Sequence, residues 1–187
     1  MLSESIDEVI KTKFANIRTM ARRELFVSMY ENYVKDLAPF NPHINVRFAR
    51  SYAEDYFRQE FFETVKIQLI ETSDDEVVGF IIISNSTADN CTAPGTNWCI
   101  HEFYIKPESR RKGYGLEAIK EFQKEHTGKV CYFILHNNKV AEAFWSRVEQ
   151  ELGWTPLDTA PYQNGFFQKD FIANFYVSEV SSPSEGF

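Results

Sequence analysis

Residues 108–122 read ESRRKGYGLEAIKEF, in which three consecutive basic residues precede a glycine–tyrosine–glycine turn and a helix-like run. Glycine lets the backbone turn tightly and brings amide N–H groups close to a ligand. The start of the following helix adds unpaired amide donors and the positive end of the helix dipole. With the charges of Arg110, Arg111 and Lys112, the stretch predicts either a pyrophosphate site or a tight turn with solvated bases.

Two other phosphate motifs do not fit this stretch. A P-loop requires GxxxxGK followed by Ser or Thr, and the sequence contains no such run. A dinucleotide fingerprint requires GxGxxG, but Gly115 is followed by Leu116, Glu117 and Ala118. Taken alone, the glycine turn therefore indicates an anion site and nothing more specific.

The segments around the turn alternate between strand and helix patterns. Strands are expected at 65–72, 77–84, 98–105 and 129–136, with one or two more within 154–177. Helices are expected in the first third of the chain, along an aromatic stripe that begins at Phe48, from the glycine turn to Gly128, and from Asn138 to Leu152, closed by Gly153. This order predicts an α+β (mixed α/β) single domain over residues 1–180, with a flexible tail at 181–187.

The N-terminal region has a helical pattern. Ser5 to Glu8 fits a capping box, and apolar residues then recur near a 3.6-residue period as far as Leu25. The pattern must end near Pro39, and whether residues 6–38 form one helix or two stays open. No strand is expected before these helices.

The composition limits the classes of partner. The 187-residue chain has a formal net charge of −7, which argues against general binding of nucleic acid or anionic membranes. Its three cysteines have no metal-type spacing, and no apolar run approaches the ~20 residues that span a bilayer. The charged N-terminus lacks the apolar block of a signal peptide. We therefore expect a cytoplasmic protein with reduced thiols.

Three linked motifs resemble the GNAT acyltransferases (Gcn5-related N-acetyltransferases). Arg110, Gly113 and Gly115 match the family signature, which is Arg or Gln, two residues, Gly, one residue, then Gly or Ala. Downstream, NKVAEAFW (138–145) and LGW (152–154) match the family's later motifs in order and spacing. The resemblance covers roughly residues 65–155. It implies the GNAT fold, in which helices flank a central mixed, mostly antiparallel sheet.

The resemblance also implies a role for each matching position. The end of strand 98–105 would splay from its neighbour and pair with the pantetheine arm of acetyl-CoA, and the turn backbone would hold the pyrophosphate. Asn138 would bond near the thiol, with Phe144 beside it. The implied cofactor-binding residues are Phe103, Tyr104, Ile105, Arg110, Arg111, Lys112, Gly113, Tyr114, Gly115, Leu116, Asn138 and Phe144. No metal is expected.

The chain departs from the family pattern at Trp145. Many relatives carry a tyrosine there, whose hydroxyl is thought to protonate the leaving thiolate. An indole N–H has negligible acidity, so Trp145 cannot act in that way, and packing in the core is the simpler interpretation. A CoA thiolate can leave without a dedicated acid, since thiols have a pKa of about 8.5.

Acetyl transfer to an amine requires a base, because an ammonium has no lone pair to attack a thioester. Glu102 is the leading candidate, since it lies on the strand beside the proposed thioester; the alternative is a carboxylate that only binds a cation. His101 would face away from Glu102 on a regular strand, so both could share a pocket only at a bulge. His136 is a second candidate, although a histidine there is more often a loop or cap residue.

The sequence thus predicts an N-acetyltransferase that uses acetyl-CoA and transfers the acetyl group directly to a primary amine. The alternative is a non-catalytic acyl-CoA-binding or sensing module of the same fold; an unrelated α+β protein is the least favoured. The acceptor could be a small molecule or a protein amine, and the acidic balance slightly favours a small cation. Dimers are common in the family, which makes a homodimer one expected state.

Overall fold

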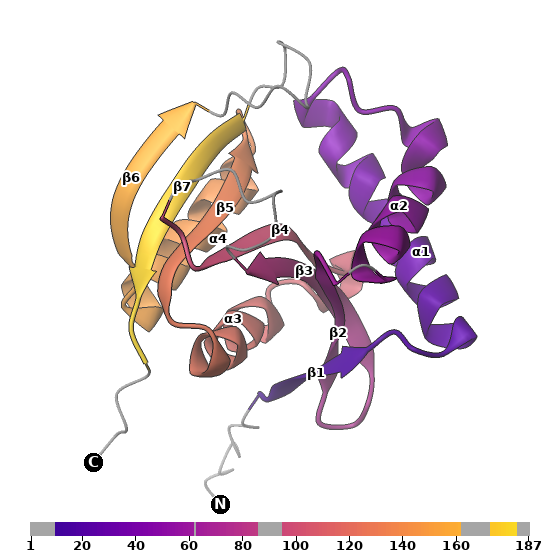
Figure 1. The fold of residues 1–187 in the computed structure, drawn as a ribbon, viewed down its shortest axis with the longest axis horizontal. Coiled ribbons are helices and arrows are strands. Elements are labelled where there is room, and N and C mark those ends of the chain that lie inside the picture. Colours follow the sequence, from indigo (N-terminus) through magenta and orange to yellow (C-terminus); the bar gives the residue numbers. More distant parts are fainter. Residues whose placement is uncertain (1–9, 62, 86–94, 162–172, 183–187) are drawn as a thin grey trace, which may run out of the picture.

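The computed structural model describes residues 10–61, 63–85, 95–161 and 173–182. These residues form one seven-stranded sheet in the order β1-β2-β3-β4-β5-β7-β6. Neighbouring strands are antiparallel except β4 and β5, which are parallel. The predicted mixed, mostly antiparallel sheet with flanking helices is confirmed (Figure 1).

The strands of the described part are β1 (Thr12–Asn16), β2 (Lys66–Thr72), β3 (Val77–Asn85), β4 (Trp98–Ile105), β5 (Gly128–Leu135), β6 (Thr155–Pro161) and β7 (Ala173–Val180). Its α-helices are α1 (Met20–Leu37), α2 (Ala49–Phe61), α3 (Tyr114–Glu125) and α4 (Lys139–Leu152). Short 3-10 turns lie at η1 (Ala38–Phe40), η2 (Val46–Phe48) and η3 (Pro107–Ser109).

The N-terminal prediction was wrong for β1. Residues 12–16 pair antiparallel with β2, so a first strand does precede the helices. Such a short strand depends on its neighbour for backbone partners, and that neighbour lies more than 50 residues away in the sequence. Helix α1 then begins after Thr19, whose side chain accepts a hydrogen bond from the Arg22 amide at 3.3 Å. The predicted capping box at residues 5–8 lies outside the described residues.

Other element ends follow the sequence signals to different degrees. Gly153 closes α4 in the left-handed conformation (φ 71°), as predicted, and Asn138 caps the start of the helix through its side chain. Helix α3 instead ends at Glu125, before Gly128. The left-handed Gly128 (φ 94°) begins β5, so its proposed role as the helix cap was wrong. The aromatic C-terminal region supplies both β6 and β7.

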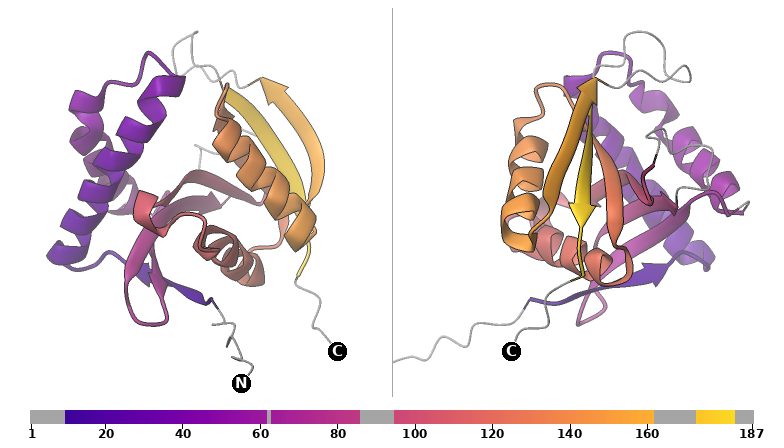
Figure 2. Two further views of the ribbon diagram at one scale, coloured as in Figure 1. Left: turned by 180° about the vertical axis from the view of Figure 1, so that it is seen from behind. Right: turned by 60° about the vertical axis from the view of Figure 1, so that its left-hand side comes forward.

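Helices α1 and α2 cover one face of the sheet, and α3 and α4 cover the other (Figure 2). Because side chains alternate along a strand, Ile82 packs on the α1 and α2 side, whereas Ile81 and Ile83 pack on the α3 and α4 side. Likewise, Tyr104 of β4 faces α1 and Phe103 faces α4. Each face therefore carries its own hydrophobic cluster, and β4 contributes to both.

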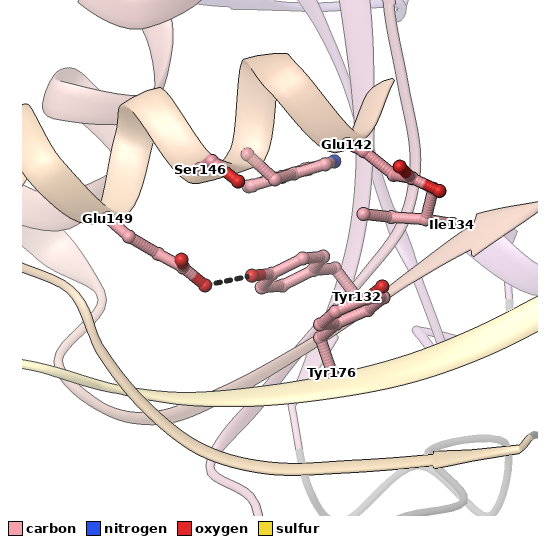
Figure 3. A pocket seen from close by; sticks show the side chains of 7 residues that line it. Tyr132, Ile134, Glu142, Ser146, Glu149 and Tyr176 are labelled. Atoms are coloured by element: carbon pink, nitrogen blue, oxygen red, sulfur yellow. Dashed lines mark hydrogen bonds between the residues drawn. The ribbon is translucent and has the colours of Figure 1, made fainter. Parts of the chain in front are cut away.

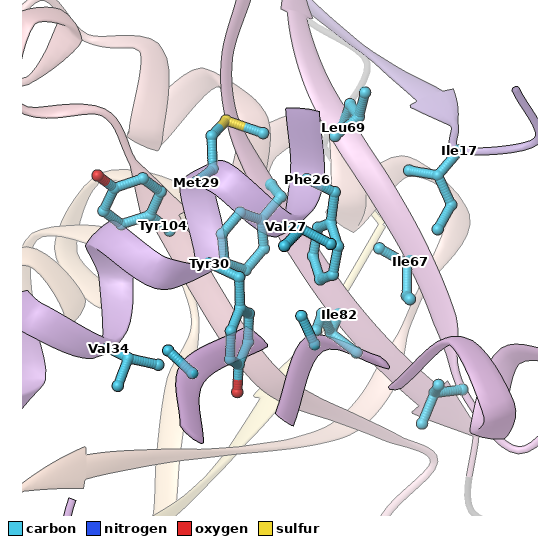
Figure 4. Packing of buried hydrophobic residues seen from close by; sticks show 14 residues of the cluster. Ile17, Phe26, Val27, Met29, Tyr30, Val34, Ile67, Leu69, Ile82 and Tyr104 are labelled. Atoms are coloured by element: carbon cyan, nitrogen blue, oxygen red, sulfur yellow. The ribbon is translucent and has the colours of Figure 1, made fainter. Parts of the chain in front are cut away.

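Aromatic rings anchor α1 to the sheet (Figure 4). The ring centroid of Phe26 lies 5.0 Å from that of Phe80 on β3, and Tyr30 stacks on Phe80 at 5.9 Å. Both α1 residues are almost completely buried. Since Tyr33 lies one turn after Tyr30, this packing turns the hydroxyls of both tyrosines toward β4.

Strands β4 and β5 pair at their beginnings only. The pairs are Trp98↔Val130, Cys99↔Cys131 and Ile100↔Tyr132. Beyond them β4 continues to Ile105 beside β3, while β5 continues to Leu135 beside β7. The two strands therefore diverge, and from Glu102 onward the β5-facing edge of β4 has no strand partner among the residues that the structure describes.

Candidate active site

The glycine turn follows β4 in the sequence and lies between η3 and the start of α3. Gly113 has φ 88° and precedes α3 without a side-chain cap. Arg111 also adopts a left-handed φ of 60°, which is unusual for a residue with a side chain. The first helical hydrogen bond runs from the Glu117 amide to the Gly113 carbonyl at 3.1 Å, so the preceding amides have no helical partner. The turn therefore has the backbone geometry of an anion site.

The three bases of this turn have different surroundings. Arg110 donates from Nε to the Ile105 carbonyl at 2.8 Å and forms an ion pair with Asp36 of α1. Arg111 and Lys112 are exposed, and within the described ranges neither has an ion-pair partner. The charge available to a ligand thus comes from Arg111 and Lys112, while the side chain of Arg110 is committed to the protein.

Gly115 provides close approach between α3 and α4. A Cβ atom at this position would lie 3.0 Å from Cε2 of Phe144. The ring of Phe144 in turn stacks on Phe103 of β4, with centroids 5.3 Å apart and planes 14° from parallel. The structure therefore brings Phe103, Gly115 and Phe144, all predicted for the cofactor, to one place. Tyr114 packs in a small cluster nearby, and Leu116 packs beside the cluster that contains Trp145.

Asn138 has a structural role at the start of α4. Its Oδ1 accepts a hydrogen bond from the Ala141 amide at 3.1 Å. The side-chain oxygen is thereby held at the start of the helix, and the amide NH2 group can donate to a ligand. Its predicted contact near a thiol stays a prediction.

Glu102 lies at the centre of three tyrosines. Its Oε1 accepts hydrogen bonds from the hydroxyls of Tyr56 (3.0 Å) and Tyr30 (3.3 Å), and its Oε2 accepts one from Tyr33. Tyr30 and Tyr33 come from α1, Tyr56 from α2 and Glu102 from β4. We call these four residues the Glu102 cluster. Glu102 itself lies two residues after Ile100, the last residue of β4 that pairs with β5.

Burial sets the ionisation of this cluster. It raises the pKa of Glu102 above its usual value of 4.5, although the three tyrosine hydrogen bonds oppose the shift. Burial and the nearby carboxylate raise the pKa values of Tyr30, Tyr33 and Tyr56 well above 10. The tyrosines are therefore neutral donors at physiological pH, and the carboxylate is the group that can take up a proton.

A β-bulge places His101 on the same face as Glu102. Ile82 pairs with Glu102 and Ile83 with Ile100, so His101 is the extra residue on β4. Its Nε2 lies 2.7 Å from Oγ of Ser84, which shares the face of Ile82. The two side chains therefore share a face because β4 has the bulge that the sequence reasoning required for this; on a regular strand they would face apart.

The remaining candidates have structural partners. Trp145 is 6% exposed and stacks on Tyr132, with centroids 4.1 Å apart, which confirms the core-packing interpretation. His136 Nε2 lies 2.9 Å from Oδ1 of Asn174 on β7. Cys99 and Cys131 are buried and lie opposite each other in the β4–β5 register without a disulfide bond between them, while Cys91 lies outside the described residues.

Comparison with known proteins identifies the family. The sequence matches the Acetyltransferase (GNAT) family over residues 27–149. The chain belongs to the GNAT family. No curated protein matches the chain. The family assignment confirms the resemblance seen in the motifs, and it covers α1 from residue 27 onward, the whole of α2 and the glycine turn.

Solved structures share this GNAT fold at low sequence identity. An acetyltransferase from Thermus thermophilus is 14% identical, with a TM-score of 0.65 over 92% of this chain and 99% of that one. A spermidine N-acetyltransferase from Vibrio cholerae, solved with CoA and spermine, is 11% identical, with a TM-score of 0.61 over 92% and 97%. The microcin C7 self-immunity acetyltransferase, solved with acetyl-CoA and AMP, is 13% identical, with a TM-score of 0.58 over 91% and 93%.

This GNAT chain has a further pocket of about 190 Å³ between α4, β5 and β7 (Figure 3). It is lined by Tyr132, Ile134, Glu142, Trp145, Ser146, Glu149 and Tyr176. Tyr132 donates to Oε1 of Glu149 there, at 2.9 Å. None of the residues predicted for the cofactor or for catalysis lines this pocket.

The described part of this GNAT chain contains no group of three or more His, Cys, Asp or Glu residues able to hold a metal ion. Among the same residues, no helix is long and apolar enough to cross a bilayer.

Sequence reasoning found Glu102 but missed the tyrosines around it. Tyr30 and Tyr33 are three residues apart, so they share one helix face, and Tyr56 lies on the aromatic stripe that begins at Phe48. These spacings were the available signal. They indicate helix faces but not which strand the faces meet.

Proposed function

We propose that this GNAT protein is an acetyl-CoA-dependent N-acetyltransferase that transfers the acetyl group directly to a primary amine. The Glu102 cluster carries the proposal, because it supplies a carboxylate of raised pKa beside the point where β4 and β5 diverge. The family supports acyl transfer as the reaction. The cluster supports an amine as the acceptor, because an amine must lose a proton to a base.

The cofactor assignment follows from the fit of the site. A pantetheine arm is an extended chain with amide groups, so it can pair with the unpaired edge of β4 at Phe103 to Ile105. The free amides from Arg111 to Leu116, with Lys112 beside them, suit the pyrophosphate. Phe144 and Asn138 would then flank the thiol end. That two similar structures contain CoA or acetyl-CoA supports this assignment.

Glu102 would serve as the general base. The acceptor nitrogen forms a bond to the thioester carbonyl carbon, and the carbon–sulfur bond breaks to release a thiolate. The proton from nitrogen passes to Glu102, either directly or through a tyrosine hydroxyl that accepts it and donates its own. The thiolate needs no acid from Trp145, which is buried in the core and has no hydroxyl.

The surface near the cluster favours a cationic acceptor with an apolar portion. Phe48 is 55% exposed and Tyr52 is 37% exposed, and they precede Tyr56 at helical spacing of four residues. Aromatic faces attract ammonium groups, and the carboxylate of Glu102 lies at the end of this row. A small amine, such as a polyamine, fits this arrangement, and the protein complexed with spermine adds support for that class.

An acetyl-CoA turnover screen across primary amines tests the proposal. The purified protein is incubated with acetyl-CoA and each amine, and the released thiol is measured. We expect release with at least one amine and background hydrolysis without it. CoA binding is measured in parallel by calorimetry, and a protein that binds no CoA would contradict the assignment.

The second candidate is an acyl-CoA-binding module without turnover. The observation in its favour is Trp145, which places a buried indole where many relatives carry a tyrosine. This module would bind CoA in the calorimeter and release no thiol with any amine. The two measurements together therefore separate the candidates.

A further inference from the structure

Arg110 connects three segments of the chain. Its Nε donates to the carbonyl of Ile105 at the end of β4, and its Nη2 forms an ion pair with Asp36 near the end of α1. Its guanidinium carbon also lies 5.5 Å from the ring centroid of Tyr104. A residue of the glycine turn is thus joined to the helix and the strand that build the Glu102 cluster.

Two short series of residues lead from Arg110 to Tyr33, the first through ring contacts and the second along α1. In the first, the ring of Tyr104 meets that of Tyr33 at 5.7 Å, and the Tyr33 hydroxyl donates to Glu102. In the second, Asp36 lies one turn after Tyr33 on the same face of α1. Both series end on Tyr33, so the position of Arg110 bears directly on the tyrosine that bonds Oε2.

We propose that Arg110 is a positioning residue that couples the cofactor turn to α1, so that CoA binding and ordering of the Glu102 cluster stabilise each other. This inference rests on the proposed function, because it assumes that CoA binds at residues 111–116. Coupling between two sites is reciprocal, so an ordered cluster would also tighten the cofactor turn.

The geometry of the turn explains how binding is transmitted. Arg110 directly precedes Arg111, which holds a left-handed φ of 60°. A ligand on the amides that follow would fix this backbone, and Arg110 with it. The guanidinium would then hold Asp36 of α1 close to Tyr104 and Ile105 of β4. A loose turn would release the same contacts.

An ion pair between exposed side chains contributes little to stability, and here both partners are 40% exposed. Asp36→Asn is therefore expected to fold normally. A purely structural pair would change the melting temperature slightly and leave the response to CoA intact. Coupling predicts a change in that response, which makes the two roles distinguishable.

Hydrogen exchange of the full-length protein, with and without CoA, tests the coupling. The peptides of interest cover the C-terminal half of α1 and the start of α3. Wild type is compared with Asp36→Asn and with Glu151→Gln, which removes the exposed Arg147–Glu151 pair of α4. In wild type we expect CoA to slow exchange in both peptides, by about 3-fold or more in α1.

In Asp36→Asn we expect CoA to slow exchange at the start of α3 but to leave α1 unchanged, while Glu151→Gln behaves as wild type. Equal slowing of α1 in Asp36→Asn would overturn the coupling, as would an unaffected α1 in wild type whose α3 start is slowed. If CoA slows neither peptide and gives no binding heat, the proposed function itself fails.

Discussion

Two glutamate–tyrosine clusters lie on opposite faces of the sheet, and they differ in their surroundings. Glu102 accepts hydroxyls from Tyr30, Tyr33 and Tyr56 on the face covered by α1 and α2. Glu149 of α4 accepts one hydroxyl, from Tyr132, on the other face. The chemical groups are the same, but the number of donors and the position relative to the sheet are not.

The difference shows what makes a carboxylate useful for catalysis. Glu102 lies on β4 just after its last pair with β5, and burial raises its pKa. Glu149 lies on a helix, and it lines a pocket to which no predicted cofactor residue contributes. Under the proposed function, proton transfer belongs to Glu102, and Glu149 serves as a matched control.

The largest expected effect comes from removing the base. Glu102→Gln keeps the shape of the side chain, and we expect turnover to fall by about 100-fold to 1000-fold, in line with the usual contribution of a general base. CoA affinity should stay within about 2-fold, because the turn is untouched. Glu149→Gln should leave turnover within about 2-fold. Steady-state rates and calorimetry on both variants check this, and equal rates for the two variants would contradict it.

The next largest effect tests whether the site that contains Glu102 binds CoA at the glycine turn. Gly115→Glu adds a side chain beside Phe144 and a negative charge where the pyrophosphate would bind. We expect the CoA dissociation constant to rise about 100-fold, equivalent to about 2.7 kcal/mol. Gly115→Ala is the control, since its Cβ meets a ring edge at 3.0 Å and adds no charge. Calorimetry that gives the same affinity for Gly115→Glu as for wild type would remove the turn from the site.

A smaller effect compares single hydroxyls from the two clusters. Tyr33→Phe and Tyr132→Phe each remove one hydrogen bond to a carboxylate. Both should lower the free energy of unfolding by about 1 kcal/mol, measured by urea denaturation. Only Tyr33→Phe should also shift the pH dependence of turnover, toward higher pH, because its bond lowers the pKa of Glu102. A shift in Tyr132→Phe as well would mean that the clusters are not independent.

The smallest effect is on stability as a function of pH. The pKa of Glu102 is higher in the folded protein than the usual 4.5, so the folded state holds this proton more tightly than the unfolded state. Its contribution is therefore fully present below pH 4.5 and is lost as the pH rises through the folded pKa. As the pH rises from 4.5 through the folded pKa of Glu102, the melting temperature of wild type should fall relative to that of Glu102→Gln. Parallel curves for the two proteins would contradict the raised pKa.

Much of the fold could be predicted because its signals are local. The apolar runs of β2 to β5 and the end of α4 at Gly153 depend on neighbouring residues, and the structure has them at those positions. The strand β1 could not be predicted, since it is stabilised by pairing with β2 across the intervening helices. A short segment with helical spacing carries no sign of a distant partner.

The strand and the glycine turn of the candidate site could be predicted from the sequence, but the way its side chains come together could not. Glu102 is predicted as the base because it lies on the strand beside the thioester site that the GNAT resemblance implies. The convergence of Tyr30, Tyr33 and Tyr56 on it depends on how α1 and α2 cross the sheet, which no local pattern encodes. The bulge at His101 likewise depends on register with β3.

The pH dependence of kcat/KM for the best amine, measured on wild type and Glu102→Gln, tests the role of Glu102 most directly. We expect a limb in wild type that rises with pH as Glu102 loses its proton, with a midpoint above 4.5. This limb should be absent in Glu102→Gln, which would retain the ionisation of the amine alone. The same profile in both proteins would contradict the assignment of Glu102 as the base.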